Sequence, residues 1–244
     1  MKPWIKIAAL ALTLSLLTLV PTYSARGTNP DGQAPLAEKI RRFAPTELTA
    51  DVSRLSANDR QALQKIIAAA KYLDPLYRRQ VWSGNEALLR KLQADKSAAG
   101  RERLHYFLIN QGPWSQLDEN QPFIEGAPPR PPQANFYPAD MTKEEFNSWL
   151  QTLPREEKEK ATGYFYVIRR DTNGKLKTVP YSEEYREFLD PAAKLLREAA
   201  ALTTNATLKD FLNKRAAAFS SNDYYDSDIA WMDLDAPIDV TIGP

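Results

Sequence analysis

The 244-residue sequence contains no cysteine and a single histidine, and these two scarcities exclude several classes of function. Without cysteine the chain forms no disulfide bond and carries no lipid-modified cysteine after its apolar N-terminal run. With His105 alone, no two-histidine metal site and no HExxH helix can be built from this chain. His105 lies in the apolar run Leu-His-Tyr-Phe-Leu-Ile, so we interpret it as a packed core residue rather than a metal ligand.

Glycine is also scarce, and its nine positions form neither a GxGxxG loop nor a Walker-type phosphate loop. The GxSxG nucleophile elbow of serine hydrolases is absent. The Gly- and Glu-containing run ending in REXXEE that is typical of Nudix hydrolases is absent too. The 32 basic and 31 acidic side chains nearly balance, and they form no clustered basic surface. We therefore expect no nucleic-acid partner.

The first 25 residues have the order of regions found in a secretory signal peptide. Lys2 and Lys6 precede an uncharged run over residues 7–20, and small residues follow it. The apolar run is short for a membrane span, although an uncleaved anchor remains the alternative. Cleavage would leave 30 basic against 31 acidic side chains and no membrane association. We expect an exported protein that is periplasmic or extracellular.

After the signal peptide the sequence predicts a polar tether over residues 26–35 and one folding unit over residues 36–244. Seven of the 18 prolines fall within residues 113–138, which excludes a regular helix or a central strand there. The same stretch contains Trp114 and Phe123, and disordered linkers contain few aromatic residues. We predict a long loop that is pinned onto the folded surface, with a flexible linker as the alternative.

The periodicity of the folding unit predicts an α+β protein that is predominantly helical. A β-hairpin is predicted around Asn173-Gly174 with a type I′ turn, and a long helix beginning near Ser182 is predicted to be interrupted at Pro191. Apolar residues alternate with polar residues over 238–242, so we also expect a half-buried C-terminal strand.

The most conspicuous group of potential ligands is acidic and lies near the C-terminus. Oxygen ligands at such short spacing can bind Ca²⁺, but the glycine and glutamate of a calcium-binding loop are missing. We therefore favour turn and capping roles for these residues. Tyr224, Tyr225 and Trp231 are interleaved with them and are our candidate contacts for a peptide or a partner protein. The six acidic residues are Asp223, Asp226, Asp228, Asp233, Asp235 and Asp239.

Three stretches resemble one family of enzymes. They are Asn135–Phe146, Tyr181–Tyr185 and Ser220–Pro244, which ends in Ile-Asp-Val-Thr-Ile-Gly-Pro. Together they resemble the N-terminal portion of bacterial metallopeptidases of the dipeptidyl-peptidase III type, and the resemblance covers about residues 36–244. It implies that the chain corresponds to one lobe of a two-lobed enzyme with a wide cleft between the lobes.

The resemblance implies an activity whose catalytic motif is absent from this sequence. Members of the family remove dipeptides from peptide N-termini, using a zinc ion held by an HExxGH-type helix and a later glutamate. No residue here matches that motif, so we assign no catalytic, cofactor-binding or metal-binding residue and expect zinc only in full-length relatives. We expect an N-terminal fragment, truncated before the zinc motif and inactive alone, whose peptide substrate requires the missing lobe. The alternatives are a complete, non-catalytic exported module that binds a peptide or protein, and an enzyme that uses carboxylates alone.

Overall fold

The computed structural model of the protein describes residues 35–244. The predicted signal peptide (1–25) lies outside the described residues, and so does the predicted tether (26–35) apart from its last residue. The described residues form eleven α-helices, one short 3-10 helix and four strands. In chain order these are α1 (Leu36–Arg41), α2 (Ala57–Ala70), α3 (Leu73–Val81), α4 (Asn85–Ala94), α5 (Ala98–Asn110), β1 (Trp114–Ser115), η1 (Gln116–Asp118), β2 (Gln121–Pro122), α6 (Lys143–Thr152), α7 (Arg155–Ala161), β3 (Tyr166–Arg170), β4 (Leu176–Pro180), α8 (Tyr181–Glu184), α9 (Arg186–Leu202), α10 (Ala206–Ser221) and α11 (Tyr225–Met232).

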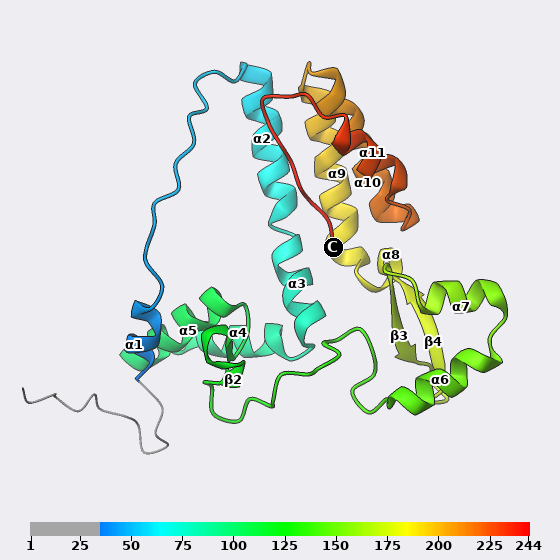
Figure 1. Ribbon diagram of the computed structural model, residues 1–244. Helices are drawn as coiled ribbons and strands as arrows, with labels where there is room; N and C mark the ends of the chain where they lie inside the picture. Colours follow the sequence, from blue (N-terminus) through cyan, green and yellow to red (C-terminus); the bar gives the residue numbers. More distant parts are fainter. Residues whose placement is uncertain (1–34) are drawn as a thin grey trace, which may run out of the picture.

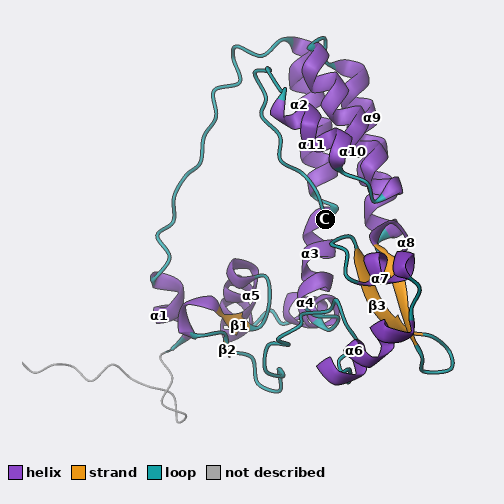
Figure 2. Ribbon diagram, turned by 45° about the vertical axis from the view of Figure 1, so that its right-hand side comes forward, coloured by secondary structure: helices purple, strands orange, loops and turns teal. Residues whose placement is uncertain are grey.

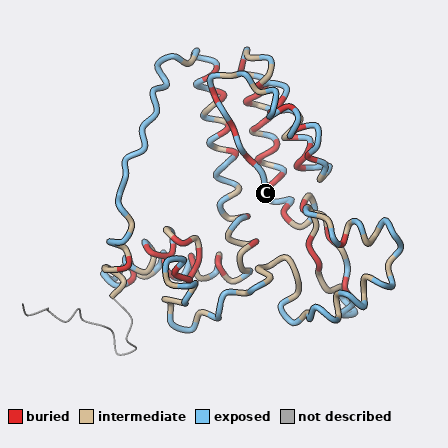
Figure 3. Tube along the Cα trace, viewed as in Figure 1, coloured by how far each residue is buried: buried red, intermediate tan, exposed pale blue. Residues whose placement is uncertain are grey.

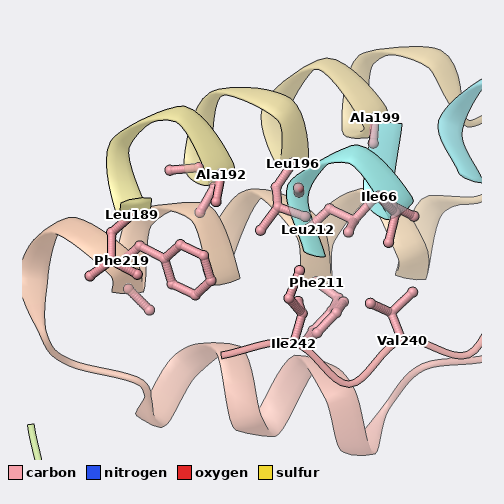
Figure 4. Packing of buried hydrophobic residues seen from close by; sticks show 14 of the residues in the cluster. Ile66, Leu189, Ala192, Leu196, Ala199, Phe211, Leu212, Phe219, Val240 and Ile242 are labelled. Carbon is pink, nitrogen blue, oxygen red and sulfur yellow. The ribbon is translucent and has the colours of Figure 1, made fainter. Parts of the chain in front are cut away.

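A helical bundle formed by α2, α9, α10 and α11 contains the largest hydrophobic core (Figure 1). Helix α9 is its centre, because it packs against α2 and against α10. Leu189, Ala192, Leu196 and Ala199 follow the three- to four-residue spacing that places side chains on one helical face. The close view in Figure 4 shows this face meeting side chains of α2 and α10.

A buried polar contact joins the start of α2 to the end of α9. Ser56 caps α2 by accepting a hydrogen bond from the backbone N–H of Asp59 at 3.0 Å. The carboxylate of Asp59 is buried and accepts hydrogen bonds of 2.7 Å from the hydroxyl of Ser56 and from the hydroxyl of Thr203, which follows α9. Because a buried carboxylate is costly without partners, this pair fixes the start of α2 against the end of α9.

Pro191 does not interrupt the long helix, so this prediction was wrong. Helix α9 runs continuously through Pro191, and the break lies earlier, at Tyr185 between α8 and α9. A proline in a helix removes one hydrogen bond to the carbonyl four residues before it. Here that loss falls near the start of α9, where the packing of Leu189 and Ala192 in the bundle core holds the helix.

The predicted hairpin is present as β3 and β4, which pair antiparallel with Val167 opposite Val179. Its turn differs from the prediction. Gly174 has a positive φ of +78°, but Asn173 does not have a positive φ. A type I′ turn needs positive φ at both positions. Instead the carboxylate of Asp171 accepts hydrogen bonds from the backbone N–H groups of Asn173 (2.8 Å) and Lys175 (2.9 Å), which closes a longer loop.

Helices α6 and α7 pack against the hairpin and form a second, smaller core. Thr142 caps α6 as its sequence pattern predicts, by accepting a hydrogen bond from the N–H of Glu145 at 3.1 Å. Phe146 and Trp149 of α6 then pack against the buried Ile168 of β3. In Figure 2 the two strands and these helices lie together at one end of the molecule, below the bundle.

The proline-rich stretch over residues 113–138 lies against the folded chain. The indole N–H of Trp114 donates to the carbonyl of Pro128 at 2.8 Å, and Asn135 N–H donates to the carbonyl of Gln80 at 2.8 Å. Phe123 packs onto a third core, which α4 and α5 provide. The Trp114–Pro128 bond therefore closes the stretch on itself, and the Asn135–Gln80 bond fixes its end to α3.

His105 is exposed on α5, so the prediction of a packed core histidine was wrong. Its neighbours in sequence, Tyr106 and Phe107, are fully buried, but they project from a different side of the helix. On an α-helix the residues that share a face are three or four positions apart. Of the four such neighbours of His105, Arg101, Glu102 and Leu108 are exposed and Ile109 is half-buried.

Residues 42–56 form an extended arm between α1 and the start of α2. Most of the arm is exposed, which Figure 3 shows as a pale blue trace standing apart from the bundle. Its α1 end is anchored by Lys39, whose Nζ lies 2.9 Å from a carboxylate oxygen of Asp118. The same carboxylate accepts from the hydroxyl of Ser115 at 2.6 Å, and Ser115 hydrogen-bonds the hydroxyl of Tyr106 at 2.6 Å.

The predominantly helical α+β class is confirmed by these elements. The predicted C-terminal strand is present only as an unpaired extended segment. Ile238, Val240 and Ile242 are buried and alternate with exposed residues, as the pattern predicts. However, the segment pairs with no strand in the part of the chain that is described, because both two-stranded sheets are formed by other residues.

Candidate interaction surface

The surface formed by α11 and residues 236–244 (the 236–244 segment) contains two of the three predicted contact residues. A tight connection after α10 positions α11. Asn222 ends α10 with a left-handed φ of 61°, and its side chain exchanges hydrogen bonds with the backbone N–H and hydroxyl of Ser182 at 2.8 and 2.7 Å. Asp223 then accepts from the N–H of Tyr225 at 3.1 Å, which starts α11. The connection is thus fixed from both sides.

The three aromatic residues predicted as contacts do not share one environment. Tyr224 is buried in the bundle core, where its ring stacks on Phe165 with centroids 4.3 Å apart. Burial raises the pKa of its hydroxyl, which finds no hydrogen-bond partner among the described residues. Tyr225 and Trp231 are exposed on α11 by 71% and 44%, so these two are available to a partner.

Arg215 of α10 connects the core to this surface. Its guanidinium lies 5.3 Å from the ring centroids of both Phe211 and Tyr224, and it donates to the carboxylate of Asp228 at 2.6 Å. Stacking of a guanidinium on aromatic rings combined with an ion pair holds the planar side chain in one orientation. The position of α11 against α10 therefore depends on Arg215.

A groove of about 420 Å³ lies between α11 and the 236–244 segment. Asp228, Trp231 and Met232 line it from α11, and Arg215 contributes from α10. The opposite wall belongs to the 236–244 segment, through Val240, Thr241 and Ile242. Figure 4 shows Val240 and Ile242 beside Phe211, so this wall is anchored in the bundle core.

The six aspartates of the C-terminal region act singly and not as a metal site. All six are exposed, and the described residues contain no group of three His, Cys, Asp or Glu side chains that could hold a metal ion. Asp223 forms a turn before α11 by accepting from the N–H of Tyr225, and Asp228 pairs with Arg215. The backbone of Asp235 exchanges hydrogen bonds with the hydroxyl of Thr207 at 3.0 and 3.1 Å. The predicted turn role therefore describes Asp223, whereas Asp228 forms an ion pair and Asp235 is held to the start of α10 through its backbone.

Two further hollows carry no arrangement of catalytic groups. One, of about 490 Å³, lies between α4, α5 and the proline-rich stretch, and its charged residues include Lys91 and the ion pair of Asp95 with Arg103. The other, of about 660 Å³, is lined mainly by prolines and polar residues of the stretch 119–134. Within residues 35–244 no helix is long and apolar enough to cross a membrane.

No protein-family model matches the chain. The solved dipeptidyl-peptidase III from Corallococcus sp. strain EGB matches 86% of this chain at 54% sequence identity, with a TM-score of 0.83. The resemblance to dipeptidyl-peptidase III is confirmed. The solved dipeptidyl-peptidase III from Caldithrix abyssi matches 81% of the chain at 44% identity, with a TM-score of 0.78.

The chain spans only part of each relative. It covers 39% of the Corallococcus dipeptidyl-peptidase III and 37% of the Caldithrix one. It is also 39% identical over 258 residues to a protein of Arabidopsis thaliana named Nudix hydrolase 3, of which it covers 33%. The Nudix run is absent from this sequence, so that part of the relative's name describes nothing found in this chain.

The donor set of this chain does not fit the zinc ion that the dipeptidyl-peptidase III resemblance implies. His105, the one histidine, is exposed on α5, and residues 35–244 contain no group of three His, Cys, Asp or Glu side chains that could hold a metal ion. Zinc sites in proteins use three or four such ligands. No zinc-dependent step is therefore assigned to the described residues.

Sequence reasoning missed Arg215, Ile229 and Met232 at the candidate surface. Ile229 and Met232 are exposed although they belong to the apolar run that surrounds Trp231. A signal for Arg215 did exist, because Phe211 precedes it by four residues, the spacing that places two side chains on one face of a helix. Its pairing with Asp228 required knowledge of the left-handed turn at Asn222.

Proposed function

We propose that this chain forms one lobe of a dipeptidyl-peptidase III-type zinc peptidase, an enzyme that removes dipeptides from the N-termini of peptides. The observation that carries the proposal is the match to the Corallococcus enzyme, at 54% identity and a TM-score of 0.83 over 86% of the chain. Identity at this level over a whole lobe supports a shared role and not merely a shared fold.

Within that enzyme the chain supplies scaffold, and the zinc chemistry belongs to residues that it does not contain. Its donor set does not fit zinc, and it matches 39% of the Corallococcus protein. The chain corresponds in this proposal to the N-terminal portion of the enzyme and is inactive alone. A peptide substrate binds only when the rest of the enzyme is present.

Two measurements test the proposal. The purified chain is expected to bind no stoichiometric zinc and to hydrolyse no dipeptidyl arylamide, so a zinc-dependent activity would contradict the scaffold role. In the second, residues 36–244 replace the matching part of the Corallococcus enzyme. We expect this chimera to hold one zinc ion and to retain hydrolysis, because the two scaffolds are similar. A folded, zinc-loaded chimera without activity would contradict the shared function.

A second candidate function is a non-catalytic module that binds a peptide or protein by itself. The exposure of Tyr225 and Trp231 on one helix favours it. The chimera separates the two candidates, because a module of independent function has no reason to restore the activity of the peptidase.

We also propose that the chain is exported, on the order of charged and apolar residues over 1–25. Mass spectrometry of the protein recovered from the cell envelope and the medium tests this proposal. The expected product lacks the N-terminal segment, and an intact N-terminus in the cytoplasmic fraction would contradict export.

A further inference from the structure

We infer that α11 and the 236–244 segment form a docking surface for an extended polypeptide segment, supplied by the part of a dipeptidyl-peptidase III-type protein that this chain does not match. The inference rests on the proposed function for the identity of the occupant. Its geometry rests on four observations, which concern exposed apolar area, unpaired backbone, charge and the length of the relatives.

The first observation is a concentration of exposed apolar side chains on α11. Twelve large apolar side chains are exposed within residues 35–244, and four of them lie on this eight-residue helix. They are Tyr225, Ile229, Trp231 and Met232, with Met232 exposed by 74%. Apolar side chains scattered singly are normal on a protein surface, whereas a cluster on one helix marks an interaction site.

The second observation is the backbone of the 236–244 segment. Its side chains Ile238, Val240 and Ile242 are anchored in the bundle core, which holds the segment extended. Yet no backbone group from residue 236 to 244 forms a hydrogen bond with the backbone of any other described residue. An extended segment that is held in place with unpaired N–H and C=O groups is a template for the addition of a strand.

The groove joins these two features. It lies between Trp231 and Met232 on one side and Ile242 on the other, with a volume of about 420 Å³. A strand that pairs with the backbone of residues 238–242 would place alternate side chains toward this groove, because successive side chains of a strand point to opposite faces. The apolar walls of the groove favour an apolar side chain on the strand that binds there.

The third observation is charge around the apolar centre. Asp226, Asp233 and Asp239 are exposed at this surface, while the nearby Lys214 pairs with Asp210 at 2.7 Å and Arg215 pairs with Asp228. The rim therefore carries an excess of negative charge. Complementary charge favours a partner segment with lysine or arginine beside its apolar residues.

The fourth observation identifies the occupant. The matched region accounts for 39% of the Corallococcus enzyme, so most of that protein must meet the matched fold across some of its surface. A stable protein interface buries about 800 Å² on each partner. The α11 surface combines an apolar centre, an acidic rim and a free strand edge, and among the described elements it is the best suited to this role.

The test compares the isolated chain with the Corallococcus chimera by hydrogen exchange. We expect the backbone amides within residues 238–243 to exchange at least about 100-fold more slowly in the chimera, because strand pairing protects them. Equal exchange rates in the two proteins would overturn the inference. Slowed exchange in a self-associated form of the isolated chain would also overturn it, because the occupant would then be a second copy.

Variants of exposed residues provide the matched control. Met232→Glu and Trp231→Ala are expected to lower the melting temperature of the chimera while leaving that of the isolated chain unchanged. Tyr164→Ala removes an aromatic ring that is 90% exposed and distant in sequence, and it is expected to change neither protein. If the Met232 and Tyr164 variants of the chimera melt alike, the docking surface is contradicted.

The outcomes also separate this inference from the proposed function. An inactive, zinc-loaded chimera with protected amides contradicts the shared peptidase function and leaves the docking surface intact. An active chimera with unprotected amides contradicts the docking surface alone.

Discussion

Replacing Asp118 by asparagine should release α1 from the body of the protein. The carboxylate of Asp118 accepts hydrogen bonds from Lys39, Arg42 and Ser115, and the side chain of Lys39 is only 7% exposed. Removing one partner of a buried ion pair costs about 3–5 kcal/mol, because the other charge stays buried without compensation. Asp118 is 27% exposed and asparagine can still accept from Ser115, so we expect a loss of about 2 kcal/mol.

Hydrogen exchange of α1 measures this loss locally. A change of about 2 kcal/mol corresponds to about a 30-fold decrease in amide protection within Leu36–Arg41. Asp51→Asn is the matched control, because Asp51 lies in the exposed arm and accepts only from Ser53. If Asp118→Asn and Asp51→Asn change the protection of α1 equally, the network does not anchor the helix.

The same variant carries a pH dependence whose sign follows from the pKa. Burial alone would raise the pKa of Asp118, but hydrogen bonds from Ser115, Arg42 and Lys39 outweigh burial and lower it well below its usual range. A carboxyl group with a lowered pKa in the folded state stabilises the fold above its unfolded pKa of about 3.9. The stabilisation is lost as the pH falls toward the folded value. The difference in α1 protection between wild type and variant should therefore shrink below about pH 4, and a constant difference would refute the electrostatic argument.

Two further predictions concern the bundle core. Tyr224→Phe should leave the free energy of unfolding in urea unchanged or raise it, because the buried hydroxyl has no partner in the described part of the chain. A loss of more than about 1 kcal/mol would reveal a partner. Burial also raises the pKa of that hydroxyl, so wild type should lose stability as the pH rises above about 10 and the Tyr224→Phe variant should lose less. Ile242→Ala should lower the free energy of unfolding in urea by about 2–4 kcal/mol, because Ile242 is buried in the core. Val52→Ala in the exposed arm should lower it by less than about 0.5 kcal/mol. Similar losses in the two variants would contradict the anchoring of the 236–244 segment.

Local patterns predicted local features of this fold well. The alternation of Ile238, Val240 and Ile242 correctly identified which side chains are buried, because alternation depends only on the extended backbone. It could not show that the segment lacks a partner strand, which depends on elements distant in sequence. The error at His105 had a different cause, since its apolar neighbours in sequence lie on another face of α5.

The contact roles of Tyr224, Tyr225 and Trp231 stay a prediction. Tyr225 and Trp231 are exposed and Tyr224 is buried, and composition alone did not distinguish them. The distinction arises at the turn after α10, where the left-handed Asn222 directs the chain so that Tyr224 meets Phe165. A turn conformation of this kind is set by contacts with Ser182, 40 residues earlier.

The division of the apolar residues among three separate cores has a consequence for cooperativity. The bundle, the hairpin–α6 region and the α4–α5 region each bury a cluster of their own, although Val167 and Val179 of the hairpin belong to the bundle core. In Figure 1 the α4–α5 region is joined to the bundle by α3 and by the extended arm. Regions that share few buried contacts open independently, each with its own free energy. Unfolding of this protein should proceed in steps, with the small α4–α5 cluster of Leu89, Leu92 and Phe107 opening before the bundle. A single melting temperature would then describe the bundle rather than the whole molecule.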